Sequence, residues 1–244
     1  MKKTVISLLF LAMSLCLYAR GLRVVFIGDS ITDGNWGVVY NYKPTSAQRS
    51  QTDMNHIYGH GYVNAVASYY EAKYPSREFL FFNRGFSGHS LSDLESRWQE
   101  DVLDLHPDIL SVLIGTNDIH AALPDTDSFD FEGWKARYKA LLERVREQNS
   151  SVKLVLCTPF VAKVGKVGDS ADYARREEAV AHLASIIREL AEECDAIVVP
   201  FDTLFFRLGK KAPGISHWIW DGIHPTPAGH FKMAELWRKK VHLR

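Results

Sequence analysis

The sequence has few cysteines, no excess of charge of either sign and, beyond its first 19 residues, no long hydrophobic run. It contains three cysteines, and 29 basic side chains balance 29 acidic ones, so the formal net charge is zero. So few cysteines exclude a disulfide-rich scaffold. Without a basic stripe there is no electrostatic reason to expect nucleic acid or an anionic membrane surface as partner. We expect Cys157, in the apolar run 154–157, and Cys194 to be free thiols.

The one long apolar run lies at the amino end. Two lysines follow Met1, residues 5–18 are almost wholly apolar, and Ala19 offers a small residue for cleavage. This pattern is typical of a secretory signal peptide and is too short for a clear membrane span, although an uncleaved anchor is an alternative. Bulky Leu15 before Cys16 argues against lipidation. We predict a signal peptide over residues 1–19, a single domain over 20–244, a secreted or periplasmic location and no membrane insertion after cleavage.

The remaining chain alternates short apolar runs with segments whose apolar residues recur every three or four positions. The runs cover residues 24–27, 79–82, 109–114, 154–157 and 197–201. Strands that alternate with amphipathic helices indicate βαβ units, hence a parallel sheet covered by helices on both faces. The fold class is therefore α/β.

Two of the predicted helices carry recognisable start signals. Ser92 and Glu95 have the spacing of a capping box. Thr226 followed by Pro227 predicts the start of the last helix. The predicted buried face of that helix consists of five residues: Ala228, Phe231, Ala234, Trp237 and Val241.

Polar, glycine-containing clusters follow the apolar runs. Three of them come directly after a predicted strand, at residues 28–32, 83–88 and 115–118, and a fourth covers residues 221–225. The carboxyl ends of parallel strands meet at one edge of the sheet, where ligands bind in open α/β folds. The sequence therefore predicts a functional site that brings these clusters together.

The residue types in the clusters match the needs of acyl transfer. A serine hydroxyl needs a base, the base needs a carboxylate to orient it, and the oxyanion needs fixed donors. Ser30 can be the nucleophile, with His224 as base and Asp221 as carboxylate. The backbone N–H groups of Ser30 and Gly88 and the side-chain amide of Asn117 can hold the oxyanion.

Each of these residues also has a structural interpretation. Ser30 can be a helix N-cap, and Asn117 with Asp118 can cap the following helix. Asp221 precedes Gly222 in a common turn pair. Only the joint occurrence of all four clusters favours the catalytic interpretation.

The four clusters together resemble the blocks of the SGNH (GDSL) hydrolase superfamily. Gly28-Asp29-Ser30-Ile31-Thr32 is similar to its first block, the segment 83–88 to its second, Gly115-Thr116-Asn117-Asp118 to its third and the segment 221–225 to its last. The resemblance implies a flavodoxin-like α/β/α sandwich with a five-stranded parallel sheet in the order 2-1-3-4-5. It also implies a serine esterase that uses Ser30, His224 and Asp221, an oxyanion hole of Ser30, Gly88 and Asn117, and no metal or other cofactor.

Substrate choice is the least determined property. The long polar and aromatic segment from Asn35 to Tyr58 follows the strand-edge serine directly, and such loops are more often functional than accidental. We expect Trp36, Tyr40 and Trp220 to contact substrate, and a polar, aromatic entrance favours short acyl groups, namely acetyl on a small-molecule or polysaccharide carbohydrate ester. Lysophospholipase, thioesterase and lipase activities are alternatives within the same superfamily, and a carbohydrate-binding module without activity is a non-enzymatic one.

Two other hydrolase classes fit the sequence less well. The α/β-hydrolase fold requires a G-x-S-x-G elbow, and no glycine follows Ser30 at that spacing. A metal hydrolase could use His56 and His60, which have the spacing of two ligands on a helix. Gly59 and Gly61 favour a loop there instead, and no glutamate lies between the two histidines.

Overall fold

The computed structural model describes residues 21–34 and 54–243. Within them, five parallel strands form one sheet in the order β2-β1-β3-β4-β5. The strands are β1 (Leu22–Gly28), β2 (Phe79–Gly85), β3 (Ile109–Leu113), β4 (Lys153–Cys157) and β5 (Ile197–Val199). The fold class, the strand number and the strand order that the resemblance implied are thereby confirmed.

Helices connect the strands, as the alternating pattern predicted. They are α2 (Ser30–Asp33), α3 (Tyr62–Lys73), α4 (Leu91–Asp101), α5 (Thr116–Ala122), α6 (Phe131–Gln148), α7 (Gly165–Gly168), α8 (Tyr173–Glu193), α9 (Phe201–Gly209) and α10 (Pro227–Val241). Short 3-10 turns cover Leu103–Leu105, Thr126–Ser128 and Ile215–His217.

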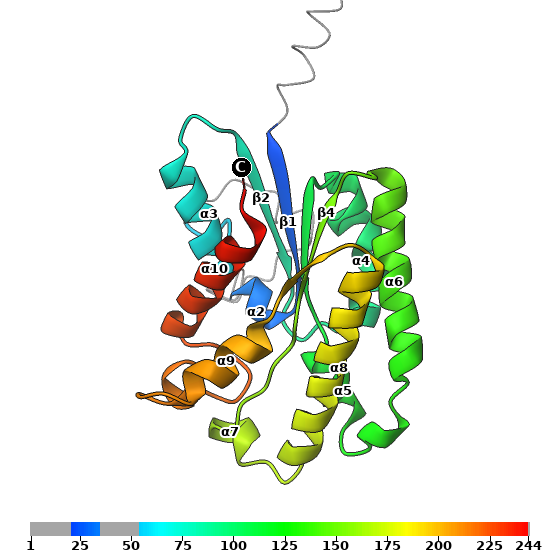
Figure 1. The fold of residues 1–244 in the computed structure, drawn as a ribbon, viewed down its shortest axis with the longest axis vertical. Coiled ribbons are helices and arrows are strands. Elements are labelled where there is room, and N and C mark those ends of the chain that lie inside the picture. Colours follow the sequence, from blue (N-terminus) through cyan, green and yellow to red (C-terminus); the bar gives the residue numbers. More distant parts are fainter. Residues whose placement is uncertain (1–20, 35–53, 244) are drawn as a thin grey trace, which may run out of the picture.

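The sheet lies between two helical layers. Figure 1 shows α3, α9 and α10 on one side of the sheet and α4, α6 and α8 on the other. Each layer encloses its own apolar core: Trp98 and Trp134 are buried in one, and Trp237 in the other. The central strands β1 and β3 are apolar on both faces because both faces are covered, which explains why they read as continuous apolar runs.

Three local expectations differ from the structure. The last strand ends at Val199, and Phe201 instead begins α9 with its ring buried. Helix α4 begins after Ser90, whose backbone N–H donates to Asp93 at 2.7 Å, so the capping box lies two residues before the predicted pair. A capping pattern is short and recurs by chance, whereas the packing of Leu91 and Leu94 decides where this helix begins.

The last helix begins as predicted but turns a different face inward. The Thr226 side chain accepts a hydrogen bond from the Gly229 N–H, and Pro227 is in the first turn. Phe231, however, is 54% exposed, and Met233 is fully buried in its place. The buried stripe of this helix consists of Met233, Ala234, Trp237 and Val241. The predicted buried face was therefore correct at the end of the helix and wrong near its start, at Phe231.

Both described cysteines are free, as expected. Cys157 lies inside the sheet, where burial raises the pKa of its thiol to about 12. No helix in the described parts of the chain combines the length and apolarity that a membrane crossing requires.

Candidate active site

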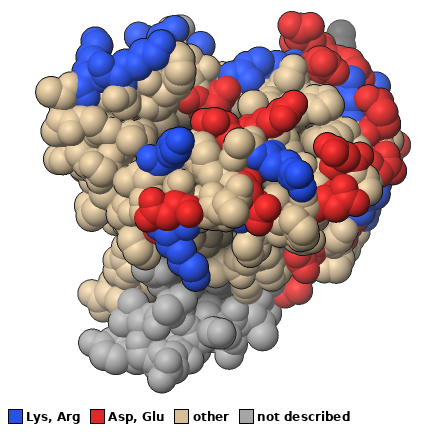
Figure 2. All heavy atoms as spheres, turned by 90° about the horizontal axis from the view of Figure 1, so that it is seen from below, with Lys and Arg blue, Asp and Glu red and all other residues tan. Residues whose placement is uncertain are grey.

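The carboxyl ends of β1, β2 and β3 bring three of the polar clusters together. Gly28, at the end of β1, pairs with Gly85 of β2 on one side and with Leu113 of β3 on the other. The segments that follow these strands therefore start from adjacent positions at one edge of the sheet. Figure 2 views the molecule from the end toward which the strands of Figure 1 run, and acidic and basic side chains both occur on this face.

The turn after β1 frees the Ser30 hydroxyl from a capping role. Asp29 is the N-cap of α2, and its carboxylate accepts the Ile31 N–H at 2.9 Å. Ser30 is the first residue of the helix, so its side chain is not needed to cap it. The alternative that Ser30 is an N-cap is therefore wrong.

A tight loop before α10 carries Asp221 and His224. The loop is closed by an antiparallel bridge between Ile219 and Pro225 and by the Trp220 N–H, which donates to the His224 carbonyl at 3.1 Å. Gly222 has φ 99°, and a Cβ atom there would lie 2.6 Å from the Val167 side chain, so only glycine fits this turn.

Asp221, His224 and Ser30 form one chain of hydrogen bonds. Asp221 Oδ1 accepts the backbone N–H groups of Ile223 and His224 at 2.9 and 2.7 Å, which fixes the carboxylate. Asp221 Oδ2 lies 2.6 Å from His224 Nδ1, and His224 Nε2 lies 2.8 Å from Ser30 Oγ. With the ring proton on Nδ1 and donated to the carboxylate, Nε2 presents its lone pair to the Ser30 hydroxyl.

The same hydrogen bonds keep Asp221 ionised. Partial burial acts to raise the pKa of its carboxyl, but the bonds from His224 and Ile223 outweigh burial and hold the pKa below its usual value. Asp221 therefore carries a negative charge beside the imidazole. This arrangement can stabilise an imidazolium ion when Nε2 takes a proton from Ser30.

The expected oxyanion donors lie on the neighbouring strand-end loops. Gly88 has φ 86°, a left-handed conformation that favours glycine, and a Cβ atom there would meet nothing within 4 Å. Its identity is therefore required by backbone conformation rather than by lack of space. Asn117, in the first turn of α5, donates one amide N–H to the His89 carbonyl at 3.0 Å, which leaves the second N–H of that amide for another acceptor.

Two buried polar residues of the predicted clusters hold these loops together, a role that the sequence interpretation did not assign to them. Asn83, at the end of β2, donates to the carbonyls of Thr32 and Tyr58 at 2.9 Å and accepts the Gly85 N–H at 2.9 Å. Asp118 accepts the Leu91 N–H and the Trp134 indole N–H at 3.0 and 2.9 Å, so it ties α5 to α4 and α6 rather than capping α5.

Arg97 of α4 joins the ends of β1 and β2 to the loop that carries Gly88. Its guanidinium donates to the carbonyl groups of Arg84 and Gly28 at 2.9 and 3.3 Å and to His89 Nδ1 at 3.1 Å. Buried Asp101 accepts from it on the other side. Because the His89 carbonyl in turn accepts from Asn117, a single arginine braces the two loops that carry the expected oxyanion donors. Only the tertiary structure could identify it, since Arg97 lies in none of the four clusters.

Two titratable groups, buried Asp29 and half-buried His230, flank the hydrogen-bonded chain. Burial raises the pKa of Asp29 to about 7, although its bond from the Ile31 N–H and the attraction of His224 oppose the shift. Burial lowers the pKa of His230 to about 4, and the nearby His224 adds to that effect. Neutral His230 accepts the Tyr62 N–H on Nδ1 at 3.2 Å, which a protonated ring could not do.

The expected substrate contacts are only partly described. Trp220 is 63% exposed, and its ring lies 6.2 Å from that of His224 at an angle of 26°, so an exposed indole adjoins the His224 imidazole. Trp36 and Tyr40 lie outside the described residues. His56 and His60 lie before α3, not on a helix, and hydrogen-bond to each other at 3.3 Å. Within the described ranges, no cluster of three or more His, Cys, Asp or Glu side chains could hold a metal ion.

A comparison with known protein families shows which family this chain belongs to. The model of the GDSL-like lipase/acylhydrolase family matches residues 26–231, which include all four clusters. The chain belongs to this family. It is accordingly a carboxylic ester hydrolase, as the four clusters led us to expect.

Two similar proteins carry names that mention an esterase or a lipase. An acetylxylan esterase of Geobacillus stearothermophilus is 29% identical over 223 residues, 91% of this chain and 94% of the relative. A crystal structure of an acetylxylan esterase from that organism has a TM-score of 0.75 at 26% identity and covers 92% of this chain and 97% of the other. A protein named as a GDSL-like lipase from Parabacteroides merdae has a TM-score of 0.75 at 30% identity, covering 90% and 95%.

Two crystal structures of the acetylxylan esterase are of variants with one substituted residue each. They are described as catalytic mutants, and they replace an aspartate and a histidine that lie three positions apart. Asp221 and His224 have the same spacing in this chain.

Proposed function

We propose that this chain is an exported esterase that removes acetyl groups from carbohydrate esters with a Ser30–His224–Asp221 triad. The observation that carries the proposal is the hydrogen-bonded chain from Ser30 Oγ through both nitrogens of His224 to Asp221 Oδ2, with separations of 2.8 and 2.6 Å. The equal spacing of the catalytic aspartate and histidine in the acetylxylan esterase supports it.

In the first half of the reaction, Ser30 Oγ attacks the ester carbonyl while His224 Nε2 accepts its proton. Asp221 stabilises the imidazolium that forms. The carbonyl oxygen gains negative charge and accepts hydrogen bonds from the N–H groups of Ser30 and Gly88 and from the Asn117 amide, each worth about 3 kcal/mol to the transition state. The imidazolium then protonates the leaving alkoxide, and the acetyl group remains on Ser30.

In the second half, water replaces the alcohol. His224 takes a proton from the water as it attacks the acetyl carbonyl, and the same three donors hold the second oxyanion. The imidazolium returns its proton to Ser30 Oγ as the bond to the acetyl carbon breaks. Acetate leaves, and the enzyme returns to its starting state.

The acetylated carbohydrate is the finer part of the proposal. It is supported by the relatives named as acetylxylan esterases and by the exposed indole of Trp220 beside the base. Export is supported by the basic start and apolar run of residues 1–19, a segment outside the described residues. We expect no membrane insertion after cleavage of this segment and no nucleic-acid partner.

The test compares wild type with Ser30→Ala on p-nitrophenyl acetate, on p-nitrophenyl esters of increasing chain length and on acetylated xylan. We expect the Ser30→Ala variant to lose at least about 10⁴-fold in kcat while its circular dichroism is unchanged. Equal activity of the two proteins would refute the triad. A preference for long acyl chains over acetyl would replace the acetylesterase with a lysophospholipase, thioesterase or lipase, and failure to release acetate from any saccharide would remove carbohydrate from the proposal.

A further inference from the structure

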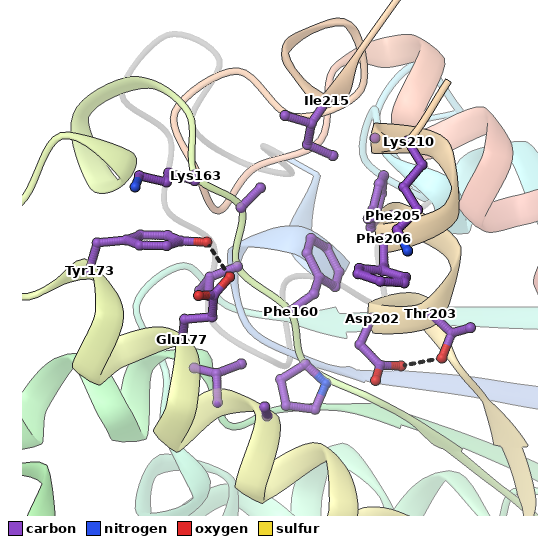
Figure 3. A pocket seen from close by; sticks show the side chains of 16 residues that line it. Phe160, Lys163, Tyr173, Glu177, Asp202, Thr203, Phe205, Phe206, Lys210 and Ile215 are labelled. Atoms are coloured by element: carbon purple, nitrogen blue, oxygen red, sulfur yellow. Dashed lines mark hydrogen bonds between the residues drawn. The ribbon is translucent and has the colours of Figure 1, made fainter. Parts of the chain in front are cut away.

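A cavity outside the proposed active site lies beyond the loop of Asp221 and His224, and none of the triad residues lines it. It has a volume of about 500 Å³, within the usual range for small-molecule sites, and lies between the start of α8, helix α9 and the segment that follows β4. Figure 3 shows Tyr173 and Glu177 of α8 on one side and Phe160, Phe206 and Lys210 on the other. Neither the mechanism nor the family clusters use these side chains.

The α9 side of the cavity is aromatic. Phe160 and Phe205 form a buried pair with ring centroids 4.5 Å apart, and both side chains are at most 3% exposed. Next to Phe205 in the chain, Phe206 is 63% exposed although it lines the cavity. An exposed phenyl ring at the mouth of a preformed cavity loses water when a ligand packs against it.

The α8 side of the cavity is polar. The Tyr173 hydroxyl donates to Glu177 Oε1 at 2.7 Å, which orients the carboxylate and leaves its second oxygen as a free acceptor within the described structure. The Lys210 ammonium lies 3.9 Å from the centre of the Phe206 ring and brings N–H donors to the opposite side. Acceptor and donor groups therefore stand across the cavity from each other.

This combination fits a neutral saccharide. A pyranose ring has an apolar C–H face, which packs on an aromatic ring, and hydroxyl groups along its edge, which need both acceptors and donors. A lipid chain has no donor for the second Glu177 oxygen, and a phosphate group would be repelled by the Glu177 carboxylate. Neither alternative uses both sides of the cavity.

One segment separates the cavity from the triad loop. Residues 159–163 line the cavity. The Ala162 N–H of this segment donates to the Gly222 carbonyl at 2.9 Å. Just after the segment, Gly165 lies close to Trp220 and Asp221. A Cβ atom at Gly165 would lie 2.6 Å from the Trp220 carbonyl oxygen. One backbone segment therefore contacts both the cavity and the loop of Asp221 and His224.

We propose that this cavity is a second carbohydrate subsite, which binds a neutral sugar unit of the polymer that carries the scissile acetyl group. The ligand identity rests on the proposed function, whereas the existence of the site does not. Occupation of this subsite contributes to the binding of long substrates and adds nothing to a substrate that ends at the ester.

The kinetic test uses Phe206→Ala and Glu177→Gln, with Phe231→Ala and Glu178→Gln as matched controls at an exposed phenylalanine and an exposed glutamate outside the cavity lining. For acetylated xylo-oligosaccharides we expect each cavity variant to raise KM roughly three- to tenfold with kcat unchanged. For p-nitrophenyl acetate neither constant should change, and the control variants should behave as wild type. Unchanged KM on the oligosaccharides, or an equal rise on p-nitrophenyl acetate, would overturn the subsite.

Direct binding separates this proposal from the proposed function. The methyl signals of Ile215 and Val180, which line the cavity, are followed by NMR while unacetylated xylohexaose, cellohexaose or mannohexaose is added to the wild-type protein. We expect concentration-dependent shifts with at least one of these sugars, and in Phe206→Ala the same shifts should need a roughly three- to tenfold higher sugar concentration. No shift at millimolar concentration of all three would overturn the subsite even if acetyl esterase activity is found. Shifts without any activity on acetylated saccharides would support the subsite and refute only the proposed substrate.

Discussion

The buried carboxyl group of Asp29 lowers the free energy of unfolding when it is ionised. Its side chain is 2% exposed, and burial raises its pKa from 3.8 to about 7. Below pH 3.8 the carboxyl is protonated in both the folded and the unfolded chain, and the cost is absent. As the pH rises from 3.8 to 7, the unfolded chain releases the proton and the folded chain keeps it, so the free energy of unfolding falls. The difference of about three pKa units corresponds to about 4 kcal/mol of lost stability above pH 7.

The variant Asp29→Asn removes this cost without removing the cap. Asparagine cannot ionise, and its side-chain oxygen can still accept the Ile31 N–H that Asp29 accepts at 2.9 Å. We expect variant and wild type to unfold with similar free energies near pH 4. At pH 8 the variant should be more stable by up to about 4 kcal/mol.

Urea unfolding between pH 4 and pH 9 measures this difference, with Asp127→Asn at an exposed surface position as control. The control measures how much an Asp→Asn change at the surface alters the free energy of unfolding. The same attraction to His224 that opposes the Asp29 shift also favours an imidazolium, so kcat of Asp29→Asn should fall while its stability rises. A stability difference between Asp29→Asn and wild type that does not change with pH would refute the reasoning.

Three further substitutions test the site. Asn117→Ala should lower kcat on p-nitrophenyl acetate by about 10²- to 10³-fold with KM nearly unchanged; a rise in KM alone would remove its oxyanion role. Arg97→Lys should lower kcat about tenfold, since one ammonium cannot brace both loops as the guanidinium does through the Gly28 carbonyl and His89; an unchanged kcat in a variant with intact circular dichroism would contradict this. His230→Asn should remove up to about 3 kcal/mol of the destabilisation that wild type undergoes between pH 6.5 and pH 4. In that range the unfolded chain binds a proton at His230, whereas the folded chain, in which the pKa of His230 is about 4, does not. Equal pH dependence of urea unfolding in variant and wild type would exclude this effect of His230.

The clusters of the proposed site could be found in the sequence because each one is a short run of neighbouring residues. Gly28 to Thr32 follows a buried strand directly, and Asp221 with His224 spans one tight turn, so a few adjacent residues suffice to suggest their roles. The alternation of apolar runs and amphipathic segments likewise predicted the parallel sheet. Helix phase was less certain, because the exposed Phe231 and the buried Met233 differ by only two positions.

The amino-acid sequence by itself determined which residues follow β1, β2 and β3, and therefore that a serine, a glycine and an asparagine would meet at one edge of a sheet. The resemblance of all four clusters to one family, and not the strand order, placed the aspartate–histidine pair beside them. Only the tertiary structure decided that Asp29 caps α2 in place of Ser30 and that Arg97 braces the loop of Gly88 against that of Asn117. The physical reason is distance along the chain. A pattern in sequence reports neighbours within a few residues, whereas burial and hydrogen bonding depend on segments that fold together from far apart. Ser30 and His224 are 194 positions apart in the chain. The sequence suggested the two residues as partners, but only the fold shows that Ser30 Oγ lies 2.8 Å from His224 Nε2.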